Sequence, residues 1–188
     1  MRTIRKILIG VAAFIGLLLF AALFVQKEYT VEREITINKP KVEVFAYIKQ
    51  IKNQEHYNKW AMLDPNMKKT YRGTDGTVGF VYAWNGNNEA GQGEQEIKSI
   101  TEGEKIDLEI KFIRPFAGVA KTPFTTVAVS ENQTKVKWGM TGGNPYPFNL
   151  MHLFMDGLLG KDLEISLVNL KSQLEKSNSG VFAFQILI

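Results

Sequence analysis

The sequence predicts an α+β protein in which a curved antiparallel sheet wraps around a long C-terminal helix, and one transmembrane helix precedes this domain in the chain. Three observations predict this fold class. Residues 7–25 are continuously apolar, residues 67–142 carry strand patterns separated by turn formers, and residues 147–176 carry a long helical pattern. We therefore expect a membrane anchor with short flanks over 1–28, one folded domain over 29–178 and an apolar tail over 179–188.

The first element is the run ILIGVAAFIGLLLFAALFV, residues 7–25, which contains no charged residue. As a helix rising about 1.5 Å per residue, it would nearly cross a hydrocarbon core of about 30 Å. A cleavable signal peptide is the alternative, but the run exceeds the usual apolar length of about 7–15 residues and no clear cleavage site follows it. Because Arg2, Arg5 and Lys6 precede the run, we expect a single-pass cell-membrane protein with a cytoplasmic N-terminus and an extracytoplasmic domain.

A strand is expected next over 29–37, where apolar and polar side chains alternate. A helix should then begin near Pro40, because its apolar residues form one stripe: Val44, Phe45, Ile48 and Ile51. A short second helix or turn over 54–62 follows, and the pair Asp64–Pro65 ends it.

The middle of the chain reads as successive strands without a long helix between them. They are expected at 67–72, 79–85, 92–101, 104–114, 122–130 and 134–142. Two of them, 104–114 and 134–142, alternate apolar with charged side chains, which predicts an antiparallel sheet with one face in water. The helical pattern of 147–176 is the only element long enough to cover the apolar face, and a sheet that curls around one helix tends to leave a gap.

Particular residues within this element order match a known fold family. The matching positions are Arg33, Ile35, Ile37, Pro40, Val44, Phe45, Trp60, Asp64, Pro65, Gly79, Trp84, Gly86, Gly91, Gly93, Ile97, Phe112, Pro115, Thr134, Val136 and Trp138. Together they resemble the helix-grip (SRPBCC) superfamily of START lipid-transfer domains, birch-pollen-type allergens and polyketide cyclase/dehydrase-like proteins, over roughly residues 29–176. The resemblance implies a ligand-binding domain for lipids, sterols or polyketides, some members of which cyclise their ligand. It implies no shared catalytic constellation.

Large side chains beside the expected gap are candidates for lining a ligand cavity. From the sheet they are Tyr82, Trp84, Phe112, Phe124, Trp138 and Met140, and from the helix Phe154, Met155 and Leu158. Phe80 shares a strand face with Tyr82 and Trp84. Of these rings, we expect those near hairpin ends to seal the core and those in mid-strand to line the cavity. Plain core packing is the alternative for each of them.

Two polar side chains are candidates for the same cavity. Arg33 has the strand parity of the buried residues Val31 and Ile35, so it needs a carboxylate or an acidic ligand head group unless it reaches out to solvent. His56 lies near the expected cavity mouth. Neither of the two histidines has a metal-ligand spacing around it, so we expect no metal and no cofactor.

The charge balance argues against nucleic acid as a partner. The chain has 23 Lys and Arg residues, of which 20 remain once the three before the apolar run are set aside, against 19 Asp and Glu residues. They are scattered and form no basic stripe. The absence of Cys excludes disulfides and thiolate metal sites.

The predicted function is a membrane-tethered binding domain for a small hydrophobic ligand or lipid. A polyketide cyclase or dehydratase is the first alternative, and it would need at least two ionisable groups converging in the cavity. A non-catalytic protein-interaction module with a filled core is the second. The apolar residues 181–188 could dock on the sheet edge, touch the membrane or bind a protein partner.

Overall fold

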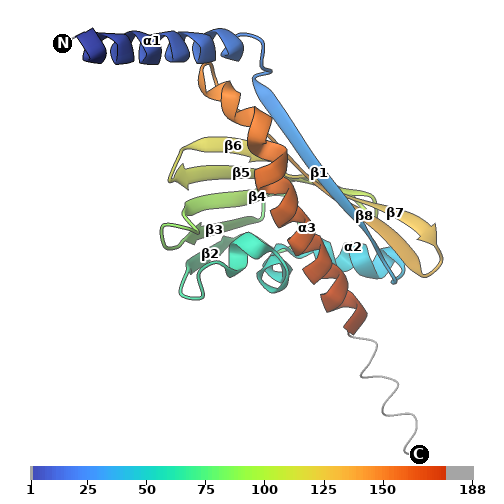
Figure 1. The fold of residues 1–188 in the computed structure, drawn as a ribbon. Helices are drawn as coiled ribbons and strands as arrows, with labels where there is room; N and C mark the ends of the chain where they lie inside the picture. The colour runs from blue at the N-terminus through green and yellow to red at the C-terminus, as the bar shows by residue number, and fades with distance from the viewer. Residues whose placement is uncertain (1, 177–188) are drawn as a thin grey trace, which may run out of the picture.

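The computed structural model describes residues 2–176, which form the predicted sheet-and-helix arrangement behind one N-terminal helix (Figure 1). The helices are α1 (Arg2–Ala22), α2 (Lys41–Lys49), η1 (Ile51–His56), η2 (Lys59–Met62), η3 (Phe148–Met151) and α3 (His152–Lys176). The strands are β1 (Glu28–Ile37), β2 (Lys68–Arg72), β3 (Val81–Asn85), β4 (Gln92–Thr101), β5 (Lys105–Arg114), β6 (Gly118–Lys121), β7 (Phe124–Ser130) and β8 (Gln133–Gly143).

The expected elements are present, with shifted boundaries and one additional strand. The N-terminal helix ends at Ala22, three residues before the end of the apolar run. A short strand, β6, follows the β5–β6 turn and was not predicted, because four residues after a Pro carry no readable alternation. The tail 181–188 lies outside the described residues. Within the described part, α1 is the helix that is long and apolar enough to span a membrane.

The eight strands form one antiparallel sheet in the order β1-β8-β6-β5-β4-β3-β2, and β7 pairs with β5 and β8. Figure 1 shows α3 crossing this sheet, with β2 to β6 on one side of the helix and β1, β7 and β8 on the other. In the β1–β8 register Val31 is opposite Met140 and Ile35 is opposite Val136. Their shared parity places these apolar side chains on the face that α3 covers.

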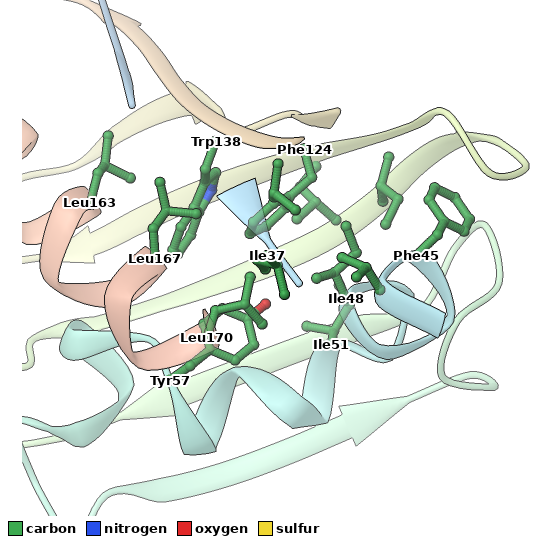
Figure 2. Close-up of a cluster of buried hydrophobic side chains, with 14 of the residues drawn as sticks. Ile37, Phe45, Ile48, Ile51, Tyr57, Phe124, Trp138, Leu163, Leu167 and Leu170 are labelled. Carbon is green, nitrogen blue, oxygen red and sulfur yellow. The ribbon is translucent and has the colours of Figure 1, made fainter. Parts of the chain in front are cut away.

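One half of the space between sheet and helix is packed solid. Figure 2 shows the side chains from α2, η1, the second half of α3 and strands β1, β7 and β8 meeting in a single cluster. Its labelled members are Ile37, Phe45, Ile48, Ile51, Tyr57, Phe124, Trp138, Leu163, Leu167 and Leu170. The rings of Phe124 and Trp138 stack with centroids 4.5 Å apart. This half is therefore a contiguous hydrophobic core.

Candidate ligand-binding cavity

The other half of the grip contains a cavity of about 210 Å³ between η2, the β3–β5 strands and the first half of α3. Apolar side chains and three amides provide most of its wall. The lining residues are Gln54, Asn58, Trp60, Ala61, Leu63, Met67, Tyr82, Trp84, Glu89, Ala90, Gln95, Ile110, Phe112, Arg114, Pro115, Met140 and Leu159. Such a wall, apolar with a few polar groups, is typical of small-molecule sites.

A glycine lets the aromatic wall form. Gly93 is paired with Trp84 across β3–β4 and with Phe112 across β4–β5. A Cβ at Gly93 would lie 2.7 Å from the Trp84 ring, so only glycine leaves room for the indole to cover this strand. The rings of Trp84 and Phe112 meet nearly at right angles with centroids 6.5 Å apart, and Trp84 Nε1 donates to the Ala90 carbonyl at 3.1 Å. The wall is therefore held in one orientation.

Two buried donors of the cavity lining have no hydrogen-bond partner among the described residues: Gln54 Nε2 and the Tyr82 hydroxyl. The Gln54 side chain is fixed by Asn58, whose Nδ2 donates to Gln54 Oε1 at 3.0 Å. This contact occupies the amide oxygen and leaves the amide nitrogen free. Gln95, also buried in the lining, reaches Thr122 Oγ1 only at 3.5 Å. Buried polar groups are normally satisfied. The packed half also holds unpaired atoms, the Tyr57 hydroxyl and Trp138 Nε1, so Gln54 Nε2 and the Tyr82 hydroxyl are distinguished by their position in the cavity wall, where a ligand could reach them.

The cavity mouth is framed by two loops tied to their neighbours. Arg114 donates from Nη2 to Asn85 Oδ1 and to the Gly86 carbonyl, both at 2.9 Å, which joins the end of β5 to the β3–β4 turn. On the other side, Asp64 Oδ2 accepts from the Asn87 backbone N–H at 2.8 Å. These contacts fix the rim formed by the β3–β4 turn and the segment after η2.

The structure brings together four of the side chains that the sequence proposed for the cavity. Tyr82, Trp84, Phe112 and Met140 line it. Phe124 and Trp138 are instead buried in the solid half, where they stack on each other. Along β3 one ring differs from the expectation. Phe80, next to the β2–β3 turn, is in the core, and Tyr82, in mid-strand, lines the cavity. Trp84, next to the β3–β4 turn, lines the cavity too, although a ring near a hairpin end was expected to seal the core.

The helix residues proposed for the cavity are displaced around α3. Phe154 and Leu158 are 67 % and 59 % exposed and lie on the outer face, whereas Met155 packs against the core cluster. Leu159 is the α3 residue that lines the cavity. Because one residue corresponds to about 100° of helix rotation, Leu158 and Leu159 face different surroundings. The first half of α3 is apolar on both sides, so periodicity alone does not say which side faces the sheet.

The two polar candidates do not line this cavity. Arg33 meets carboxylates of α3: it donates to Asp156 Oδ1 at 2.8 Å and Oδ2 at 3.0 Å, and to Glu164 Oε1 at 2.8 Å. Gly160 allows this contact, because a Cβ there would collide with the guanidinium group. Arg33 thus attaches the first half of α3 to β1 through charge. His56 is exposed at the end of η1, with its side chain outside the lining.

Sequence reasoning missed the amide groups of the lining. Gln95 has the strand parity of Gly93 and Ile97, so its inward position was readable from the alternation of 92–97. Gln54 lies in η1, a six-residue 3-10 helix that is too short for a periodic pattern to predict which side chains are buried.

The ionisable side chains of the lining are few: Tyr82, Glu89 and Arg114. Burial raises the pKa of the Tyr82 hydroxyl to about 12, so Tyr82 stays protonated and acts as a donor at neutral pH. Glu89 is exposed on the β3–β4 turn. Within residues 2–176 there is no group of three or more His, Asp or Glu side chains placed to hold a metal ion.

Comparison with known proteins shows the fold. No protein-family model matches the chain, and no curated protein sequence matches it. Among solved structures, Ara h 8.0201 aligns with a TM-score of 0.53 at 16 % identity, over 79 % of this chain and 99 % of that one. The Zhui aromatase/cyclase from a Streptomyces species aligns with a TM-score of 0.59 at 8 % identity, over 79 % and 94 %.

A third similar structure is norcoclaurine synthase from Thalictrum flavum, in complex with dopamine and hydroxybenzaldehyde. It aligns with a TM-score of 0.57 at 11 % identity, over 83 % of this chain and 90 % of that one. These structures share the helix-grip architecture, so the predicted fold is confirmed. At such low identity the likeness is one of fold, and function must be argued from the cavity.

Proposed function

We propose that this protein is a membrane-tethered binding domain for a small hydrophobic ligand that carries a hydrogen-bond acceptor. The observation that carries the proposal is the contrast between the two halves of the grip. One half is packed solid, while the other keeps an apolar cavity of about 210 Å³ with two unpaired buried donors. A domain that needed only stability would fill this space, because cavities destabilise a fold.

The size and chemistry of the cavity restrict the ligand. An engineered apolar cavity of about 150 Å³ holds benzene, so this one has room for a larger ring system or a segment of an alkyl chain. Gln54 Nε2 and the Tyr82 hydroxyl are both donors. The matching ligand group is therefore an oxygen acceptor such as a carbonyl, carboxyl, ether or hydroxyl oxygen.

The tether in this proposal is α1. Its apolar length suits a bilayer, and in the described structure its side chains have no protein cover apart from Ala22 near its end. The cations Arg2, Arg5 and Lys6 before the apolar run favour a cytoplasmic N-terminus, which places the domain on the extracytoplasmic side. A single-pass anchor would keep the cavity near lipid, where apolar compounds are concentrated.

An enzyme of the cyclase or dehydratase type is the second candidate, favoured only by the printed names of two similar structures, an aromatase/cyclase and a synthase. Such a reaction needs a proton donor and an acceptor held against the substrate. Of the lining groups, Tyr82 is a donor that does not ionise near neutral pH, and Glu89 points from an exposed turn. Binding without chemistry is thus the better supported function.

Tryptophan fluorescence tests the binding proposal directly. Two of the three tryptophans, Trp60 and Trp84, line the cavity, and α1 contains none. In the full-length protein in nanodiscs, a brominated fatty alcohol should quench them saturably. A brominated alkane, which lacks an acceptor, should need a higher concentration.

The control for this test is a pair of matched substitutions. Ala61→Phe places a ring in the lining and should abolish the saturable component, while Ala128→Phe adds the same ring at an exposed position near the end of β7, outside the lining, and should leave it unchanged. The proposal fails if no probe quenches saturably, or if quenching is equal in both variants.

A further inference from the structure

The outer face of α3 changes character along its length. In the first two turns most exposed side chains are large and apolar: Leu153, Phe154 and Leu158 are each more than half exposed. The exposed charged residue among them is Asp156, which is paired with Arg33. From Lys161 onward charged side chains such as Glu164 appear on this face. A surface helix of a water-soluble domain normally keeps its outer face polar throughout, so the first half of α3 indicates an apolar neighbour.

A second apolar group lies on the rim of the cavity. Phe116, at the tip of the β5–β6 turn, is 83 % exposed. It follows Arg114 and Pro115, which line the cavity mouth. The exposed ring thus belongs to the same loop that frames the opening. A phenylalanine displayed at a loop tip is typical of side chains that enter the boundary between headgroups and acyl chains.

The end of α1 is attached to this part of the domain. Asn149 Nδ2 donates to the carbonyls of Ala22 and Val25, both at 2.7 Å, and His152 Nδ1 bonds to the Gln26 carbonyl at 2.8 Å. Asn149 is buried, so this attachment is part of the fold. Figure 1 shows α1 running back over the start of α3, toward the side on which the β3–β4 and β5–β6 turns also point.

From these three observations we infer that the apolar end of the domain, Phe116 together with Leu153, Phe154 and Leu158, lies in the lipid–water interface. The cavity mouth would then open toward bilayer lipid. The inference rests on the proposed tether, because α1 fixes which surface meets the membrane. A bilayer is the occupant that fits, since the patch adjoins the end of a helix whose exposed surface is apolar from Ile7 to its end.

Site-directed spin labelling tests the inference on the full-length chain, which has no native Cys. Single cysteines at Phe116→Cys and Phe154→Cys carry the nitroxide, and the protein is reconstituted in phosphatidylcholine vesicles. Leu17→Cys in α1 is the lipid reference, and Val168→Cys, exposed farther along α3, is the water reference. The measured quantity is the ratio of nitroxide collisions with oxygen to collisions with a water-soluble nickel chelate, which rises with depth in lipid.

We expect the ratio at positions 116 and 154 to exceed that at 168 several-fold and to remain below that at 17, as for sites in the interface. If 116 and 154 match 168 while 17 reports lipid, the inference is overturned and the tether stands. If 17 itself reports water, the tether fails and the inference falls with it. Spin–spin broadening at 154 that disappears on dilution with unlabelled chain would show that a second copy covers the patch, which also overturns the inference. Ligand binding is measured separately, by fluorescence quenching in the cavity. A failure of ligand binding can therefore be distinguished from a failure of membrane contact or of the tether.

Discussion

Replacing Tyr82 by Phe removes one oxygen atom from the cavity wall and should change stability and affinity in opposite directions. The Tyr82 side chain is 6 % exposed, and its hydroxyl has no partner among the described residues. The ring would keep its stacking on Trp84, where the centroids are 5.7 Å apart. The substitution therefore isolates the hydroxyl from the packing of the ring.

The expected size follows from the desolvation of that hydroxyl. Leaving a buried polar group unpaired costs about 1–3 kcal/mol, so Tyr82→Phe should stabilise the empty protein by a similar amount. For a domain of this size, each kcal/mol corresponds to a rise in Tm of about 2–4 °C. In the complex the hydroxyl donates to the ligand, and losing a net contribution of about 0.5–1.5 kcal/mol weakens binding about 2- to 10-fold.

The assay combines thermal unfolding by circular dichroism, without ligand, with the half-saturation concentration of the brominated fatty alcohol. Tyr71→Phe is the matched control, because the Tyr71 hydroxyl already donates to Glu55 and lies outside the cavity lining. It should lower Tm and leave the affinity unchanged. A lower Tm for Tyr82→Phe, or an affinity equal to that of the wild type, would refute the reasoning.

Three further predictions concern the cavity wall, the ion pair between Arg33 and α3, and the membrane topology. Gly93→Ala should destabilise the domain by about 1–3 kcal/mol in denaturant unfolding because its Cβ meets backbone and ring atoms at 2.7 Å, whereas Gly118→Ala, with open space around it, should be nearly neutral; equal effects would contradict this. Hydrogen bonds from Arg33 hold the pKa of Asp156 below its ordinary value, so their stabilising effect is present above about pH 4 and is lost as the pH falls through the lowered pKa. Asp156→Asn should accordingly flatten the Tm-versus-pH curve below about pH 4. A curve that keeps its shape would count against a stabilising Arg33–Asp156 ion pair. For topology, Asn132→Cys, in the exposed β7–β8 turn, should react with a membrane-impermeant maleimide in intact cells, and labelling only after permeabilisation would reverse the orientation.

Much of the fold could be predicted because in most elements the apolar residues recur with the period of a strand or of a helix. The alternation in 104–114 and 134–142 defined β5 and β8 within one residue at each end. The strand β6 was not predicted, because four residues carry too little pattern and its pairing with β5 and β8 depends on tertiary contacts. Sheet order likewise depends on which strands meet after the chain has crossed the helix.

The cavity was harder to predict than the fold for a physical reason. Strand parity correctly placed Tyr82 and Trp84 on the inner face, yet it places Trp138 there as well. Whether an inward ring fills space or borders it depends on what approaches from the opposite side. At one end of the sheet the opposing side chains come from α2 and the second half of α3, and at the other end from the short η segments. The alternation along a single strand does not show which of these elements will pack against it.

The two halves of α3 explain why cavity and exposed patch occur together. The second half buries one stripe of leucines and shows charge outside, as a helix on a water-soluble core does. The first half is attached to β1 through Arg33, which Gly160 lets approach closely, while Leu159 on the same half borders the cavity. Its other side carries Phe154 and Leu158, so this segment is apolar on both faces. A helix segment of that kind requires two apolar neighbours, and a ligand inside with lipid outside would provide both. Replacing Phe154 by a charged residue should then weaken contact with vesicles without changing the cavity wall, because the two faces of α3 are separate surfaces.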